Sequence, residues 1–344
     1  MMAFNLARIL AAALLARAAA FDCATGRCPM GEGNDTAAAT TTSTTAYCKT
    51  VAECAAHPDL VVPVSVNQVL KAPADRTPDS VRKQHTKRNP LKVSAREWRD
   101  RTELAAVYRA LHLYGMGDDL AAQCVMMRTT DTRDEFLMHE WGVFFEEVTA
   151  SNLLKYDFDG HLVEPDGSRA PALPDVSNMG CLPVAAAIFK ARPDAAMVVH
   201  IHPPAVMAVA GMEAGLLPVS QAAFFLHGQV SREGYDFTYE TSFEDNLAAG
   251  FADGKRAMLL NHHGMYAIGA SPAEAFFVAY HLNQACEVQV RTLGMNGGVL
   301  YPTEGHLRPQ YADMMLSPDY AYDGSREWPG TLRKVIRKHP DFNL

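Results

Sequence analysis

The chain has 344 residues, of which 48% are hydrophobic and 20% are charged, and its formal net charge at pH 7 is −8. This length and apolar content are sufficient to bury one substantial core, so they favour a single domain of about 200–250 residues with extensions. The negative charge argues against nucleic-acid binding, which needs clustered Lys and Arg to neutralise phosphates. The basic stretch at residues 82–101 is interpreted as a solvated linker, with a binding arm or a processing site as the alternative.

The first twenty residues have the order of a targeting signal. Arg8 precedes a short apolar run at residues 9–16, and three alanines stand directly before Phe21. The run is too short to cross a bilayer as a helix, and we expect no membrane span. We therefore predict a signal or targeting segment at residues 1–20 that leads to the secretory pathway or the extracellular space. Because Arg17 lies close to the apolar run, a plastid or other organellar presequence is the alternative, and an unprocessed chain would stay in the cytosol.

Cysteine and proline usage sets the remaining boundaries. Four of the seven cysteines cluster in the first 54 residues, which is expected of disulfides in an oxidising compartment; a zinc site is the alternative, although neither pair has the short CxxC spacing. The Ala- and Thr-rich residues 31–46 are predicted to be disordered, and residues 58–93 contain five prolines. We therefore predict a Cys-containing, low-complexity, Pro-rich extension at residues 21–93, a globular domain at residues 94–315 and a C-terminal helical tail at residues 316–344.

Hydrophobic periodicity within the predicted domain indicates both helices and strands. A capping box at residues 94–97 begins the first helix, which Gly115 and Gly117 end. Further helices are predicted at residues 182–191, 243–251 and 272–293, and strands at residues 124–128, 135–139, 155–158, 197–202 and 257–261. Because these elements alternate irregularly, the pattern predicts a layered α/β or α+β domain with some antiparallel pairing.

Two histidines on one predicted strand form the sharpest candidate site. His200 and His202 point to the same face of the strand, so both imidazoles can reach one ion, and the two prolines that follow end the strand at a sheet edge. A third ligand is expected from residues 262–264 (His-His-Gly), which follow another apolar strand, with His227 as a further candidate. Three histidines with a vacant fourth position are typical of a catalytic zinc site. Two ordinary histidines at a strand end are the alternative interpretation.

Several motifs, in their order along the chain, resemble class II aldolases and adducin heads. These motifs are residues 147–151 followed by Lys155, residues 191–194, residues 198–205, residues 261–264, residues 285–293 and residues 327–333. The resemblance is closest to adducin-like members, and it implies an α/β fold of three layers (αβα) with a central mixed, largely antiparallel sheet, assembled as a homotetramer. It also implies that His200, His202 and His263 bind Zn²⁺ or another divalent metal, because His263 directly precedes the glycine.

Departures from the family pattern bear on the reaction. The position of the aldolase carboxylate that serves as acid or base falls on Cys181, which makes it the candidate catalytic residue; a base, a zinc-binding thiolate and an inert buried cysteine are the three interpretations. The phosphate-binding loop of the aldolases corresponds to Gln123 and Cys124 ahead of Arg128, and its Thr-Gly pair to residues 141–142 (Trp-Gly). The resemblance therefore implies that phosphorylated sugars are not the substrates.

Two functions are consistent with these residues. The first, which we prefer, is a metal-dependent lyase or aldolase-like enzyme for a small, unphosphorylated hydroxy-carbonyl or hydroxy-acid substrate, with the cation as Lewis acid. Its weakness is the missing carboxylate, for which Glu146 and Glu147 are the candidate substitutes. The second is an adducin-like, non-catalytic oligomeric scaffold with an actin- or spectrin-type partner, which the resemblance at residues 285–293 favours.

Overall fold

The computed structural model describes residues 89–120, 123–235, 241–303 and 323–344. The predicted targeting segment, the four N-terminal cysteines and most of the predicted extension lie outside the described residues. Within the described ranges, no helix is both long and apolar enough to cross a membrane.

The helices and strands have the following bounds. The helices are α5 (Ala95–Leu113), α6 (Cys181–Ala191), α7 (Pro204–Ala210), α8 (Gln221–Phe225), α9 (Thr241–Ala249), α10 (Pro272–Leu293) and α12 (Trp328–Lys338). The strands are β1 (Cys124–Arg128), β2 (Glu135–His139), β3 (Leu153–Asp157), β4 (His161–Val163), β5 (Arg169–Pro171), β6 (Met197–Ile201), β7 (Val230–Glu233), β8 (Ala257–Leu260) and β9 (Gly264–Gly269).

The strands form one sheet in the order β5-β4-β3-β2-β1-β6-β9-β8-β7. Neighbouring strands pair antiparallel, except that β7 and β8 run parallel. Strands β1, β2, β6, β8 and β9 are buried along their whole lengths, as expected of strands covered on both faces. The predicted mixed, largely antiparallel sheet is therefore confirmed.

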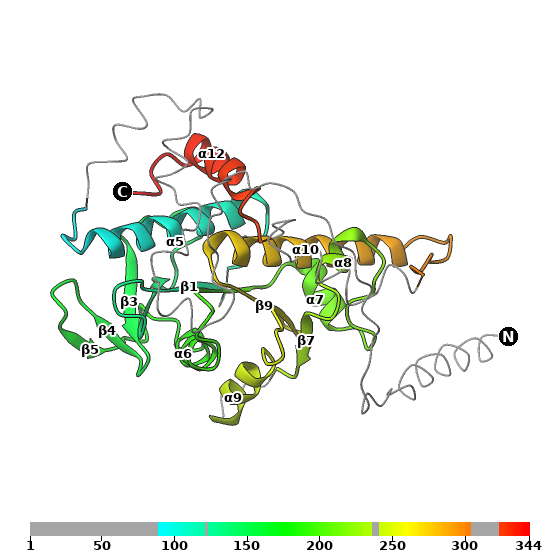
Figure 1. Ribbon diagram of the computed structural model, residues 1–344, viewed down its shortest axis with the longest axis horizontal. Helices are drawn as coiled ribbons and strands as arrows, with labels where there is room; N and C mark the ends of the chain where they lie inside the picture. The colour runs from blue at the N-terminus through cyan, green and yellow to red at the C-terminus, as the bar shows by residue number, and fades with distance from the viewer. Residues whose placement is uncertain (1–88, 121–122, 236–240, 304–322) are drawn as a thin grey trace, which may run out of the picture. The chain divides into compact units, whose positions relative to one another are not determined.

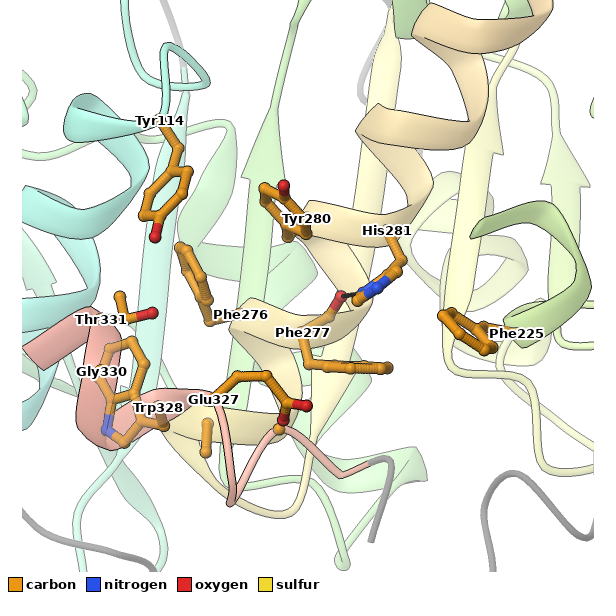
Figure 2. A pocket seen from close by; sticks show the side chains of 12 residues that line it. Tyr114, Phe225, Phe276, Phe277, Tyr280, His281, Glu327, Trp328, Gly330 and Thr331 are labelled. Atoms are coloured by element: carbon orange, nitrogen blue, oxygen red, sulfur yellow. Dashed lines mark hydrogen bonds between the residues drawn. The ribbon is translucent and has the colours of Figure 1, made fainter. Parts of the chain in front are cut away.

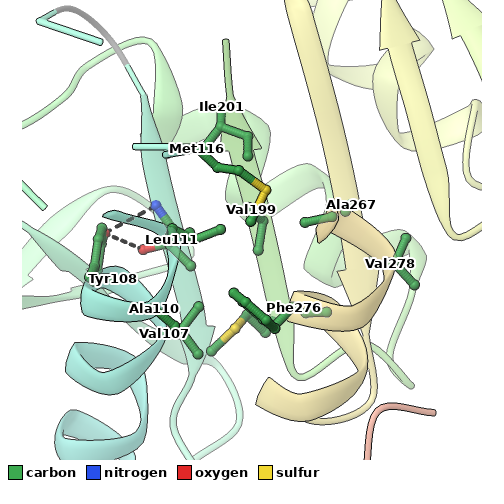
Figure 3. Packing of buried hydrophobic residues seen from close by; sticks show 14 of the residues in the cluster. Val107, Tyr108, Ala110, Leu111, Met116, Val199, Ile201, Ala267, Phe276 and Val278 are labelled. Atoms are coloured by element: carbon green, nitrogen blue, oxygen red, sulfur yellow. Dashed lines mark hydrogen bonds between the residues drawn. The ribbon is translucent and has the colours of Figure 1, made fainter. Parts of the chain in front are cut away.

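Helices lie on both faces of this sheet, which gives the predicted three layers (Figure 1). Alternate residues of a strand face opposite layers. On β6, Val199 and Ile201 join the core formed with α5, α7, α10 and α12, whereas Val198 joins the core formed with α6 and α9. Figure 3 shows the first of these cores, with Leu111 of α5 and Phe276 of α10 among the side chains packed there.

The local sequence explains where α5 begins and ends. The Ser94 hydroxyl accepts a hydrogen bond from the Glu97 amide at 3.0 Å, which confirms the predicted N-cap. Gly115 follows the helix with a φ of 67°, a left-handed conformation that favours glycine. In the middle of the helix, the Tyr108 hydroxyl donates to the Val125 carbonyl at 2.6 Å, which ties α5 to β1 (Figure 3).

A buried ion-pair cluster links α5 to the first strands. The Lys155 ammonium on β3 lies 2.9 Å from the Glu97 carboxylate and 3.4 Å from that of Glu135 on β2. Arg101 pairs with Glu97 at 2.8 Å, and Arg169 pairs with Glu135 at 3.1 Å. Each carboxylate is thus shared between two cations, which offsets the cost of burying its charge. Lys155, which belongs to one of the motifs that resemble adducins, therefore has a structural role.

Helix α12 lies within the predicted C-terminal tail. Its Trp328 ring packs against Phe276 of α10, with the ring centroids 5.5 Å apart. Beyond the helix, the Phe342 carbonyl accepts a hydrogen bond from the Ala150 amide at 2.8 Å, and Asp341 pairs with Arg109 of α5 at 3.0 Å. Because the Phe342 side chain is fully buried, the last residues complete the core on the α5 side of the sheet.

The structure contains elements that the sequence pattern does not predict. Strand β9 is buried along its whole length and begins and ends with glycine, so it lacks the polar alternation by which a strand is recognised. Strands β4 and β5 have three residues each, which is too short for any periodicity. Strand β3 is Leu153–Asp157, so it begins two residues earlier and ends one residue earlier than the predicted strand at residues 155–158.

A buried carboxyl on α5 makes stability depend on pH. Asp100 is 3% exposed, and burial raises its pKa from 3.8 to about 7, although its carboxylate accepts hydrogen bonds from the Thr130 amide and hydroxyl. Between these two pH values the unfolded chain has lost the Asp100 proton while the folded chain keeps it. Rising pH therefore favours unfolding there, by at most about 1.4 kcal/mol per pH unit.

We expect Asp100→Asn to remove this contribution, since the amide oxygen can still accept both hydrogen bonds. Thermal unfolding from pH 4 to pH 8 measures it: the melting temperature of the variant should rise relative to that of the unchanged protein as pH increases. Asp134→Asn serves as the control, because Asp134 is exposed and lies, like Thr130, in the connection between β1 and β2. This variant should leave the pH profile unchanged. Parallel profiles for Asp100→Asn and the unchanged protein would contradict the assignment.

Candidate metal centre

The three histidines singled out in the sequence lie together. His200 is the fourth residue of β6, His202 follows the end of that strand, and His263 lies in the turn between β8 and β9. Strand β9 pairs directly with β6, with Ile201 opposite Met265. The turn that carries His263 therefore meets the end of β6, although β8, the strand before this turn, is separated from β6 by β9.

The imidazoles present their Nε2 atoms to one point. The Nε2 atom of His200 lies 3.0 Å from that of His202 and 3.4 Å from that of His263. One nitrogen from each ring falls within 4.8 Å of the others, and this is the group of metal-ligating side chains found among the described residues. Two nitrogens bound tetrahedrally to zinc at about 2.0–2.1 Å lie about 3.3–3.4 Å apart. The spacing and the imidazole donors therefore fit a zinc-type divalent cation.

The second nitrogen of two of these rings has a partner of its own. The Nδ1 atom of His200 lies 3.0 Å from the Met265 carbonyl, to which it can only donate. The Nδ1 atom of His202 lies 2.6 Å from a carboxylate oxygen of Asp119. In the tautomer that these partners select, Nδ1 carries the proton and the Nε2 lone pair faces the common point.

Burial keeps two of these imidazoles neutral. Desolvation lowers the pKa of His200 well below its usual value, with the neighbouring His202 and His263 adding to the effect. Desolvation likewise lowers the pKa of His263 from 6.5 to about 4. Neutral imidazole is the form that binds metal, so no proton has to be displaced from these two rings at neutral pH.

Aromatic rings and one glycine fix the imidazole orientations. Tyr266 stacks on His200 with ring centroids 4.1 Å apart, and Tyr235 stacks on His263 at 3.7 Å. Gly264 packs against the His202 ring, where an added Cβ would lie 2.4 Å from His202 Cδ2. The glycine after His263 is therefore required for close packing between the two strands that carry the ligands.

Cys181, the candidate catalytic residue, is joined to Cys124 by a disulfide bond. A disulfide sulfur has no thiol proton and no negative charge, so in this state Cys181 offers neither a base nor a thiolate ligand. Cys124 lies directly opposite His200 in the pairing of β1 with β6, and Cys181 begins α6. The bond therefore connects β1, the strand next to that of His200, to helix α6. Cys286 is a buried free cysteine.

Other residues that the sequence analysis considered have different partners. Glu146 lies 3.0 Å from His112, and the Glu147 carboxylate accepts a hydrogen bond from the Phe144 amide at 3.0 Å. The Arg128 guanidinium donates to the Arg133 and Phe189 carbonyls and is not free to bind phosphate. His227 lines a separate cavity and is not among the grouped ligands.

A further cavity of about 410 Å³ lies between α8, α10 and α12 (Figure 2). Its aromatic lining consists of Tyr114, Phe225, Phe276, Phe277, Tyr280 and Trp328. Of its polar side chains, His281 uses Nδ1 to donate to the Phe277 carbonyl at 2.9 Å. The three grouped histidines do not line this cavity, so it is separate from the candidate metal centre.

We expect Gly264→Ala to weaken metal binding at least about tenfold, the lower end of the loss seen when the support of a ligand is removed. The new methyl group would displace the His202 ring or the Ile201 carbonyl, from which it would lie 2.7 Å away. Gly297→Ala, at a position with no atom near its Cβ, is the matched control. Competition with a chromogenic chelator measures both variants, and equal affinities would contradict this account of the glycine.

We expect the double substitution Cys124→Ala/Cys181→Ala to lower the free energy of unfolding by about 2–4 kcal/mol, because the bond closes a loop with a sequence separation of 57. Urea unfolding with and without a dithiol reductant measures the effect. The reductant should destabilise the unchanged protein to a similar degree, and any effect on the variant reports the other cysteines. A variant as stable as the unchanged protein would show that the bond is absent in solution.

Comparison with known proteins places this arrangement in a family. Residues 102–290 match the family described as "Class II Aldolase and Adducin N-terminal domain". A Caulobacter vibrioides protein that is provisionally named an aldolase class 2 protein is 31% identical over 256 residues, which is 73% of this chain and 94% of the relative. The β-adducin of Rattus norvegicus is 37% identical over 245 residues, which is 69% of this chain but only 31% of that protein.

A solved structure gives the same result. The crystal structure of an aldolase II superfamily protein from Pseudomonas syringae superposes with a TM-score of 0.64 at 29% identity, and covers 77% of this chain and 100% of its own. Sequence, fold and the histidine group agree, and the chain belongs to the class II aldolase and adducin N-terminal domain family.

Proposed function

We propose that this protein is a metal-dependent lyase of the aldolase type that acts on a small, unphosphorylated hydroxy-carbonyl or hydroxy-acid substrate. The observation that carries the proposal is the convergence of three Nε2 atoms, with the Nδ1 atoms of His200 and His202 already engaged by other groups. Three apolar side chains would pack at these positions more favourably, because burying a polar ring carries a desolvation cost. Packing alone therefore does not explain the histidine group.

The chemistry follows from the number of protein ligands. Three histidines leave coordination positions for substrate oxygens, which is typical of catalytic rather than structural metal sites. A bound divalent cation would supply Lewis acidity, which stabilises the enolate formed when a bond next to a carbonyl breaks. The stacked rings of Tyr235 and Tyr266 hold two of the ligands in place.

The contacts of Gln123 and Arg128, which occupy the positions of the aldolase phosphate-binding loop, support the expectation of an unphosphorylated substrate. Gln123 is 6% exposed and donates its side-chain amide to the Gly117 and Asp119 carbonyls at 2.8 and 2.9 Å. The Arg128 guanidinium carbon lies 5.2 Å from the ring centroid of Phe158 and 4.9 Å from that of Phe189. Both side chains are therefore engaged inside the protein and are not available to hold a phosphate dianion.

A non-catalytic, adducin-like scaffold is the second candidate function. It is favoured by the similarity to β-adducin and by the disulfide bond at Cys181, which removes the thiol from the position of the family's acid or base. Under this function the histidine group would have no catalytic role, and the partner would be a filament of the actin or spectrin type.

Metal content and turnover distinguish the two functions. Elemental analysis of the purified protein should show about one zinc or similar ion per chain, and the ion should be lost in a His200→Ala/His202→Ala variant. His227→Ala, outside the histidine group, is the control and should retain the ion. A panel of small hydroxy-acids and ketols should include a substrate whose cleavage stops when a chelator removes the metal.

The opposite results are equally informative. A protein that retains its metal but turns over none of the panel, and that sediments with filaments, would replace the lyase with the scaffold. A protein that binds no divalent cation at neutral pH would remove the metal centre itself from the proposal.

A further inference from the structure

Residues 117–119, which follow α5, approach His202 from the side opposite its Nε2 atom. This segment carries Asp119, whose carboxylate oxygen lies 2.6 Å from Nδ1 of His202. The His202 side chain is 6% exposed and that of Asp119 is 32% exposed. The contact is thus short, and its imidazole side is shielded from water, so it is stronger than an ordinary surface ion pair.

Two further contacts hold this segment in place. The Gln123 side-chain amide donates to the Gly117 and Asp119 carbonyls, which fixes the backbone around Asp119. Gly117 also packs tightly against Phe145, because an added Cβ would lie 2.4 Å from the Phe145 ring. The side chains of Gln123 and Phe145 therefore fix the backbone of residues 117–119.

Cys124, the residue after Gln123, connects these residues to the candidate metal centre. Cys124 begins β1 and lies opposite His200 in the adjacent strand β6. Gln123, which holds the Asp119 backbone, therefore directly precedes the strand that pairs with the strand of His200. A displacement of this segment would reach His202 through the Asp119 carboxylate.

We propose that Asp119 is a positioning residue of the metal centre, which holds the His202 ring with Nε2 toward the cation and places a negative charge one residue beyond the ligands. This inference rests on the proposed metal-dependent function. The physical reason is that a carboxylate bound to the far nitrogen of a ligating imidazole fixes its tautomer and its rotation and increases its basicity. The charge also balances part of the +2 of the cation, which three neutral imidazoles leave uncompensated.

The same charge bears on the choice of substrate. A partly exposed carboxylate next to a metal ligand repels other anions near the site, and a phosphate group carries close to two negative charges. Asp119 therefore favours substrates with neutral or singly charged groups over phosphorylated substrates, in agreement with an unphosphorylated hydroxy-acid or ketol.

The test compares Asp119→Ala and Asp119→Asn with Asp118→Asn. Asp118 is the adjacent carboxylate, but its side chain is 66% exposed and lies 3.3 Å from His112, which is not among the grouped ligands. Dissociation constants for Zn²⁺ come from competition with a chromogenic chelator, and the visible absorption of the Co²⁺-substituted protein reports the ligand geometry. Circular dichroism of the metal-free variants shows that each has folded.

We expect Asp119→Ala to weaken Zn²⁺ binding about 10–100-fold and to change the Co²⁺ spectrum. Asp119→Asn retains a hydrogen-bond acceptor without the charge, so its affinity should fall between those of Asp119→Ala and the unchanged protein. The affinity of Asp118→Asn should stay within about twofold of the unchanged protein. If Asp119→Ala fails to fold, Asp119→Asn carries the test.

Two results would overturn the inference, and they differ from each other. If the unchanged protein binds Zn²⁺ and both Asp119 variants bind it equally well with the same Co²⁺ spectrum, Asp119 has no positioning role, although the proposed function stands. If the unchanged protein binds neither Zn²⁺ nor Co²⁺, the proposed function fails first and the inference fails with it.

Discussion

The pairing of β6 with β9 is the interaction on which the candidate site and the core around it depend. The two strands run antiparallel near the middle of the sheet, and both are buried along their whole lengths. Because His202 follows the end of β6 and His263 precedes the start of β9, the last backbone pairs of this ladder bring the ligands together. A shift of one residue in the register would turn His200 to the opposite face and separate the group.

Much of what makes this chain resemble its family maintains the fold rather than the chemistry. Arg192 donates to the carbonyls of Phe251 and Lys255, which joins the ends of α6 and α9. Gln289, fully buried on α10, donates to the Gly215 carbonyl and accepts from the Leu217 amide. Family membership therefore accounts for the architecture, and the proposed chemistry would depend on the side chains around the histidines.

The sequence was sufficient for most of the fold and for the histidine group. Residues 200 and 202 share a face because a strand has a period of two, and the predicted bounds of the strands at residues 124–128 and 135–139 agree with β1 and β2. Strand β9 was missed because it begins and ends with glycine, a residue that is depleted in strands. The Cys124–Cys181 bond and the Asp119–His202 contact could not be predicted, because each depends on a tertiary approach that no local pattern encodes.

The disulfide bond also determines which part of the domain is free to vary. The chain between Cys124 and Cys181 includes the β4–β5 hairpin, and the turn of this hairpin at residues 164–168 is exposed. Because the covalent link bypasses this hairpin, insertions, deletions or a cut there leave the sheet and α6 fastened together beside His200. The hairpin is therefore a region where new binding surfaces can evolve without loosening the wall of the candidate metal centre.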